Sequence, residues 1–310
     1  MTLGFYSPET VAESAYGFHK ELVVNPSQPV VLEIVLSNGN IRVLYSHDGE
    51  VAITAEGLGP IGDRLDASYF KAAFLVEQDG NRIQVHSVPN QESLQSKSRI
   101  NYRIDVPYRT EVTSRVDRGS QSFTGVMGPV KAEGGSGDIK ASYLSKGLQV
   151  EVGSGNLEFE VIGEHAAAKT GSGNISAIRM TQGVDAESGD GDITLTVVGP
   201  STAAITRGTG RIEVAGARGS FDGSTQAGDL HMKAELHGDW RLRSISGTIR
   251  MELPPAQKAD LDAATDTGAI QLDRDDIAHP QQDTRHFMQK LNGGGPRIEA
   301  RTGSGRILLR

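Results

Sequence analysis

Apolar and polar residues alternate in short segments that recur along the second part of the chain. Two residues after a repeated glycine stands isoleucine or leucine in nine copies: Ile139, Leu157, Ile175, Ile193, Ile212, Leu230, Ile249, Ile270 and Ile307. Four residues after that glycine an apolar residue stands again, and the residue between is polar except at Leu308. This period of two predicts β-strands with one buried face.

A second strand precedes each of these glycines. The residues seven and five positions earlier are mostly apolar or small, for example Leu148 and Val150, or Trp240 and Leu242. Threonine or serine recurs three positions before the glycine: Thr170, Ser188, Thr225, Ser244, Thr265 and Thr302. Each repeat therefore reads as strand, glycine turn, strand, and Gly-x-Gly turn.

The repeat has a nearly fixed period. Gly137, Gly155, Gly173 and Gly191 are evenly spaced, and the gaps from there to Gly268 are equal or slightly longer. The last gap, from Gly268 to Gly305, is close to two periods. A constant period of roughly 20 residues is typical of solenoids. We predict an all-β fold, a parallel β-solenoid (β-helix), with about 18 residues and two main strands per coil; parallel crossovers favour a right-handed coil.

The pattern also divides the chain. Residues 1–110 hold short alternating segments without the repeat, so we expect irregular N-terminal coils that cap the solenoid and are continuous with it. A helical turn is expected within 66–76. The regular array is expected over 111–310, with an insertion at 273–296 that packs on a face or end. Pro280 and the glycines at 293–294 predict a short helix at 280–291 within that insertion.

The C-terminal strand ends the chain without a cap sequence. An uncovered strand invites pairing with another edge, and Leu308 breaks the outward-polar rule. We therefore expect the insertion or a second copy to cover this end. The chain would be a monomer, or an edge-to-edge homodimer through the C-terminal coil.

Composition narrows the function classes. The 310 residues include 38 glycines and no cysteine, and the net charge of −8 argues against a nucleic-acid binder. No apolar run reaches the length of roughly 18 residues that a membrane span needs, so no membrane-spanning segment is expected. The first residues, from Met1 to Lys20, lack an export signal, which predicts a cytoplasmic protein, or an exported or cell-surface one if a signal has been removed.

Several segments together carry a family resemblance. The Gly-Ser-Gly-Asp-Ile cassettes that begin at 135–139, the Asp105-Val106-Pro107 before the array, and Leu-Asn-Gly-Gly-Gly-Pro at 291–296 resemble the bacterial putative-adhesin family. The resemblance spans residues 20–310. It implies a β-helical domain of unknown function with no established catalytic residues, and many members are exported or membrane-anchored.

A row of acidic and amide residues occupies one position of the coil: Asp138, Asn156, Asn174, Asp192 and Asp229. Such a row could bind Ca²⁺ or a sugar. Asp and Asn are also common turn residues that bond nearby backbone. The row is interrupted by Arg211, Thr248, Ala269 and Arg306. We favour the structural interpretation and predict no catalytic residues, no metal site and no cofactor.

Three other groups of residues offer candidate chemistry. Glu187, Asp190, Asp192 and Asp229 form the best acidic cluster for a carbohydrate-active enzyme, but short turns leave no loops to wall a cleft. His279, Asp283 and His286 have poor spacing for a metal. Trp240 is expected in the core, with Arg241, Arg243 and Arg250 as an outward solvated patch.

The sequence thus favours a non-catalytic scaffold or adhesin-like interaction module for an unknown protein or glycan ligand. Two alternatives remain open. One is a β-helix carbohydrate-active enzyme of lyase or glycosidase type, and the other is a polymer-forming cytoplasmic scaffold.

Overall fold

The computed structural model describes residues 17–47, 49–59, 62–88, 98–273 and 284–310. The chain forms two compact units, residues 1–145 and 146–310. Within the described ranges the first unit has one helix, α1 (Ala67–Ala73), and the strands β1 (Phe18–Val23), β2 (Val30–Asn38), β3 (Asn40–Tyr45), β4 (Glu50–Leu58), β5 (Phe74–Asp79), β6 (Arg82–Ser87), β7 (Arg99–Val106), β8 (Thr110–Arg118), β9 (Gln121–Thr124), β10 (Val130–Ser136) and β11 (Ile139–Leu144).

The second unit continues the strand numbering. Its strands are β12 (Leu148–Ser154), β13 (Leu157–Ile162), β14 (Ala166–Ser172), β15 (Ile175–Met180), β16 (Val184–Ser188), β17 (Ile193–Val198), β18 (Ser201–Thr206), β19 (Ile212–Ala217), β20 (Ser220–Thr225), β21 (Leu230–Lys233), β22 (Trp240–Ser244), β23 (Ile249–Glu252), β24 (Ala259–Thr265), β25 (Ala269–Leu272), β26 (His286–Leu291), β27 (Arg297–Thr302) and β28 (Arg306–Leu309).

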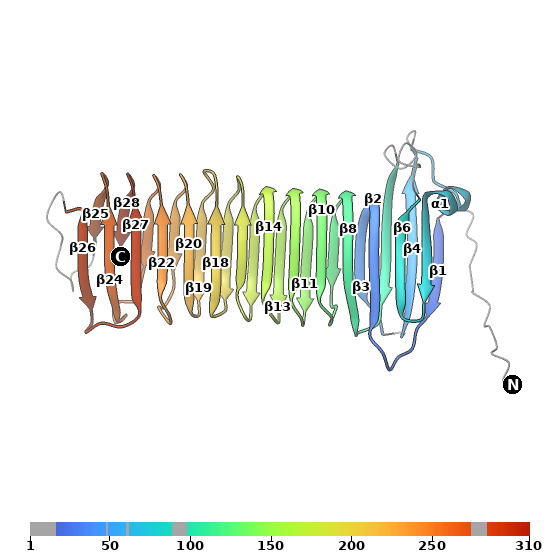
Figure 1. Ribbon diagram of the computed structural model, residues 1–310, viewed down its shortest axis with the longest axis horizontal. Coiled ribbons are helices and arrows are strands. Elements are labelled where there is room, and N and C mark those ends of the chain that lie inside the picture. The colour runs from blue at the N-terminus through green and yellow to red at the C-terminus, as the bar shows by residue number, and fades with distance from the viewer. Residues whose placement is uncertain (1–16, 48, 60–61, 89–97, 274–283) are drawn as a thin grey trace. The chain divides into compact units, whose positions relative to one another are not determined.

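Two sheets, drawn in blue to green in Figure 1, form the first unit. Sheet I runs β1-β4-β7-β3-β9-β11, and sheet II runs β5-β6-β2-β8-β10. β3 pairs in parallel with β7 and β9, while β2 pairs in parallel with β6 and β8. The coil β2–β3 is therefore enclosed between later parts of the chain, so sequence order and spatial order differ here.

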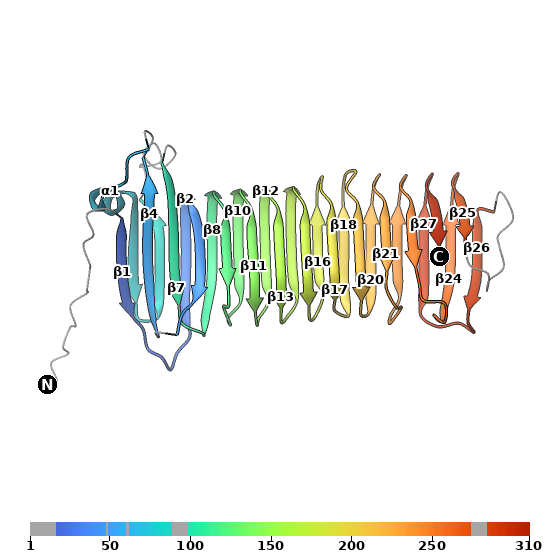
Figure 2. The same ribbon diagram turned by 180° about the vertical axis from the view of Figure 1, so that it is seen from behind.

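The outer strands of the first unit run antiparallel. β4 is antiparallel to β7, β1 to β4, and β5 to β6. Helix α1 lies beside these strands (Figures 1 and 2). The Asp66 carboxylate accepts the Tyr69 N–H at 2.9 Å as an N-cap, and Phe70 and Phe74 pack edge to face in the core. The expected helical turn within 66–76 is confirmed.

The second unit is a regular parallel stack (Figure 2). Sheet III runs β13-β15-β17-β19-β21-β23-β28-β25, and sheet IV runs β12-β14-β16-β18-β20-β22-β27-β24-β26. Ile175 pairs with Ile193, and Ile193 with Ile212. Equivalent residues of successive coils therefore form buried columns, and Trp240 is fully buried as predicted. The parallel β-solenoid with two main strands per coil is confirmed.

The C-terminal coil is not at the end of the stack. β27 lies between β22 and β24, and β28 lies between β23 and β25. The chain builds the coil β24–β25 one place further out and then returns to fill the gap. The premise that the C-terminal strand lies at the end of the stack and needs a cover is therefore wrong, because β27 and β28 each have two parallel partners within the chain. Whether the protein is a monomer or a homodimer stays a prediction.

The insertion contains a strand where the sequence predicts a helix. β26 pairs antiparallel with β24 and is the last strand of sheet IV; residues 280–283 of the predicted helix lie outside the described residues. The insertion does pack at an end, as expected. Asp262 of β24 links it to the terminal coil through His286 (2.9 Å), Arg297 (2.7 Å) and Arg301 (2.8 Å). An antiparallel end strand also interrupts the parallel register that end-to-end polymerisation would continue.

The coil corners depend on glycine and on buried hydroxyls. Gly173 has φ +142°, and a Cβ there would clash with the Gly155 carbonyl oxygen of the preceding coil, so a side chain is excluded. The Ser188 hydroxyl donates to the Gly173 carbonyl at 2.9 Å. The recurring Thr or Ser before each glycine thus satisfies corner backbone groups that water cannot reach.

Candidate functional site

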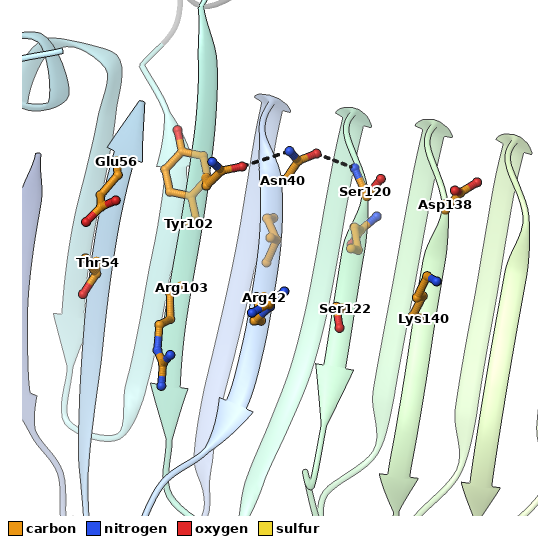
Figure 3. Close-up of a pocket in the computed structure, with 13 residues that line it drawn as sticks. Asn40, Arg42, Thr54, Glu56, Tyr102, Arg103, Ser120, Ser122, Asp138 and Lys140 are labelled. Atoms are coloured by element: carbon orange, nitrogen blue, oxygen red, sulfur yellow. Dashed lines mark hydrogen bonds between the residues drawn. The ribbon is translucent and has the colours of Figure 1, made fainter. Parts of the chain in front are cut away.

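A hollow of the first unit lies on the outer face of sheet I (Figure 3). It has a volume of about 630 Å³ and spans β4, β7, β3, β9 and β11. Inward residues of these strands, such as Val43 and Ile104, form the core. The alternate residues must therefore point outward, where the hydrogen-bonded ladder fixes their spacing.

The register aligns the outward side chains in two rows across the strands. Thr54 pairs with Arg103, Arg103 with Arg42, Arg42 with Ser122, and Ser122 with Lys140. In the second row, Glu56 pairs with Asn101 and Asn101 with Asn40. The outward lining thus consists of fixed cations, amides, hydroxyls and a carboxylate.

Hydrogen bonds hold the second row in place. Asn40 Nδ2 donates to Asn101 Oδ1 at 2.9 Å, and Asn40 Oδ1 accepts the Ser120 N–H at 3.1 Å (Figure 3). The NH₂ group of Asn101 and the carboxylate of exposed Glu56 have no protein partner among the described residues. Two amide N–H donors and two carboxylate oxygens therefore face the hollow side by side.

The cations of the first row differ in their pairing. Arg103 binds Asp105 through two hydrogen bonds of 2.8 and 2.9 Å, which raise the pKa of Arg103 and neutralise its charge locally. Arg42 lies directly beside Arg103, and its guanidinium has no hydrogen-bond or ion-pair partner in the described part of the chain. Arg42 is therefore the unsatisfied donor at the centre of the hollow.

The predicted Asp and Asn row joins successive coils. In the second unit Asn156 Oδ1 accepts the Asn174 N–H at 2.9 Å, and Asn174 Oδ1 accepts the Asp192 N–H at 2.9 Å. Asp192 and Asp229 accept the N–H groups of Arg211 and Thr248. These side chains act structurally as expected, but they bond the next coil and not their own backbone.

The acidic cluster suggested for an enzyme is divided between the two sheets, and three of its four carboxylates already have partners. Glu187 lies on sheet IV and pairs with Arg207 at 2.7 Å, a hydrogen bond that lowers the pKa of Glu187. Asp192 and Asp229 precede strands of sheet III and bond backbone, and Asp190 is exposed in a corner. Arg250 likewise lies on sheet III, apart from Arg241 and Arg243 on sheet IV, so the predicted arginine patch is divided.

The histidine group gives no metal site among the residues that can be placed. His279 and Asp283 lie outside the described residues, and His286 pairs with Asp262. No group of three or more His, Cys, Asp or Glu side chains within the described ranges is arranged to hold a metal ion. No helix there has the length and apolar character needed to cross a membrane.

Comparison with known proteins gives a family and several structural neighbours. Residues 76–310 match the model of the Toastrack DUF4097 family. A putative adhesin from Bacteroides fragilis is 13% identical, with TM-score 0.39 and coverage of 96% of this chain and 99% of that one. A putative lipid binding protein from Parabacteroides distasonis is 11% identical, with TM-score 0.42 and coverage of 96% and 98%. No curated protein matches.

Proposed function

Because this chain belongs to the Toastrack DUF4097 family, we propose its role from the site itself: it is a non-catalytic interaction module that binds a glycan in the hollow of sheet I. The observation that carries the proposal is the placement of unpaired donors beside an unpaired acceptor. Arg42 and Asn101 offer N–H groups, and Glu56 offers carboxylate oxygens. A hydroxyl both donates and accepts, so a polyhydroxylated ligand can satisfy all three.

Other ligand classes fit this lining less well. A lipid tail needs apolar walls, which these outward side chains do not provide. A nucleic acid needs a basic face with aromatic stacking platforms, whereas the chain has a net charge of −8 and Glu56 stands in the hollow. A flat, polar, rigid surface suits the face of a carbohydrate chain.

The carboxylates of the hollow are too far apart for glycoside hydrolysis. Glu56 is on β4 and Asp138 immediately precedes β11, with β7, β3 and β9 between those strands. Four strand spacings amount to about 19 Å, whereas acid–base hydrolysis needs two carboxyls roughly 5–10 Å apart. Asp105 is neutralised by Arg103. This geometry supports binding over cleavage.

The test is a glycan array followed by titration of the strongest hit. Arg42→Met keeps the aliphatic stem and removes the donors, and Asn101→Ala removes the amide. Each should weaken the hit about tenfold, the effect of losing one hydrogen bond to a charged or polar group. The matched control, Arg241→Met, removes an exposed unpaired arginine from the described part of sheet IV and should bind like wild type. Binding that survives Arg42→Met, or a cleaved glycan in mass spectrometry, would overturn the proposal.

A further inference from the structure

A second hollow, in the second unit, collects three arginines. It lies on sheet III, has a volume of about 470 Å³, and includes Arg211, Arg250 and Arg306 in its lining. Arg306 comes from β28, the last strand of the chain, which stands next to β23 only because the terminal coil is inserted there. The hollow is therefore a product of the interleaved topology.

None of the three guanidinium groups has a hydrogen-bond or ion-pair partner among the described residues. Arg250 and Arg306 lie diagonally on adjacent strands, since Arg250 pairs with Leu308 two residues along, which places their Cα atoms about 7–8 Å apart. Arg211 lies about 14 Å from Arg306, across three strand spacings. Arg250 and Arg306 are close enough to repel each other, and neither carboxylate of the hollow, Glu213 or Asp229, forms an ion pair with any of the three arginines among the described residues.

The hollow also contains acceptors. Glu213 and Asp229 line it, and one oxygen of the Asp229 carboxylate accepts a hydrogen bond from the Thr248 N–H at 2.9 Å. These carboxylates would repel a continuous line of phosphates, but they can accept hydrogen bonds from hydroxyls. Leu308, only 8% exposed although it points outward, gives the floor an apolar patch.

We propose that this hollow binds an acidic carbohydrate chain that carries carboxylate groups. The guanidinium forks of Arg250 and Arg306 pair with successive carboxylates, and the sugar hydroxyls donate to Glu213 and Asp229. The spread of the arginines over several strands fits an extended chain lying across the strands. This site is separate from the hollow of sheet I and does not depend on the function proposed for it.

The experiment is isothermal titration of the full chain with oligogalacturonate, alginate and hyaluronan oligosaccharides. The matched ligand control is methyl-esterified oligogalacturonate, which keeps the sugar backbone and loses the charge. The best acidic ligand should bind wild type, weaken about tenfold for Arg250→Gln or Arg306→Gln, and weaken further for the double variant. Arg241→Gln, on sheet IV outside both hollows, should leave binding unchanged, and thermal melting of each variant checks that it is folded.

Three results would overturn the proposal. The first is the absence of binding by any of the acidic oligosaccharides. The second is equal binding of the methyl ester, which would show that the carboxylates are not recognised. The third is a short polyphosphate that binds more tightly than every acidic carbohydrate, which would assign the arginines to a phosphate-bearing ligand.

Discussion

Replacing Thr225 by valine should destabilise the second unit through a single buried backbone group. Thr225 is 3% exposed, and its hydroxyl accepts the Gly228 N–H at 3.0 Å and donates to the Gly210 carbonyl at 3.3 Å. Valine has nearly the same shape, so the substitution opens no cavity. The Thr206 hydroxyl lies 2.8 Å from Thr225 Oγ1 and 3.0 Å from the Gly210 carbonyl. In the variant it can still donate to that carbonyl, and so the Gly228 N–H is the group left without a partner.

A buried donor without a partner costs about 1–3 kcal/mol, so we expect the free energy of unfolding to fall by roughly 2 kcal/mol. Urea unfolding of the variant and the wild type measures this loss of stability. Hydrogen exchange at the Gly228 amide should be faster in the variant than in the wild type. The control is Thr194→Val, an exposed strand position where the change should stay within about 0.5 kcal/mol. If Thr225→Val and Thr194→Val differ by less than about 0.5 kcal/mol, the hydroxyl row does not support the corners.

Three further changes probe the corners, the terminal coil and the end strand. Gly173→Val should lower the melting temperature far more than Thr194→Val, because its Cβ would clash with the Gly155 carbonyl oxygen; equal shifts would mean that this corner tolerates a side chain. The hydrogen bond from Arg301, with those from His286 and Arg297, holds the pKa of Asp262 well below its usual range. The ionised Asp262 carboxylate therefore stabilises the fold fully above the ordinary aspartate pKa of about 3.9, and this stabilisation is lost as the pH falls below that value. Asp262→Asn should lower the free energy of unfolding by about 2 kcal/mol at pH 7 and make it less dependent on acid pH in urea titrations. An unchanged pH dependence would count against the cluster. Deleting 276–292 removes β26 and bares the outer edge of β24, so light scattering should show concentration-dependent self-association, whereas a monomer at every concentration would show that the edge needs no cover.

Much of the stack could be predicted from local pattern. The alternation around Ile175 and Ile193 defines strands, and the constant glycine spacing places those two residues side by side, as the register confirms. The recurring Thr and Ser before each glycine are visible as a pattern, but their partners are carbonyl and N–H groups of the corners. Those contacts depend on how coils stack, so the sequence alone does not explain them.

The order of the terminal coils could not be read from spacing. The long gap between Gly268 and Gly305 looks like two periods in chain order. In space Gly305 stacks directly on Gly247, and Gly268 stacks on Gly305. Each strand accepts a parallel neighbour on either side, so local pattern does not determine which coil is outermost. The helix prediction at β26 is wrong because Pro280 and the glycines after it resemble helix boundaries, while pairing with β24 favours a strand.

The candidate site could not be predicted for the same reason. Arg42 and Arg103 occupy outward positions of two alternating segments that lie far apart in the sequence. Only the return of the chain from β4 to β7 places β7 beside β3 and aligns the two arginines. The domain boundary at residue 110 and the cellular compartment stay predictions, since no contact of the described residues depends on either.

The most direct measurement for the central claim is a crystal structure of the protein with its strongest uncharged array glycan bound, since acidic glycans are assigned to the hollow of sheet III. We predict an intact glycan over β7, β3 and β9, with sugar hydroxyls on Arg42, Asn101 and Glu56. A glycan bound on another face of the molecule, or a cleaved product in the density, would contradict the account.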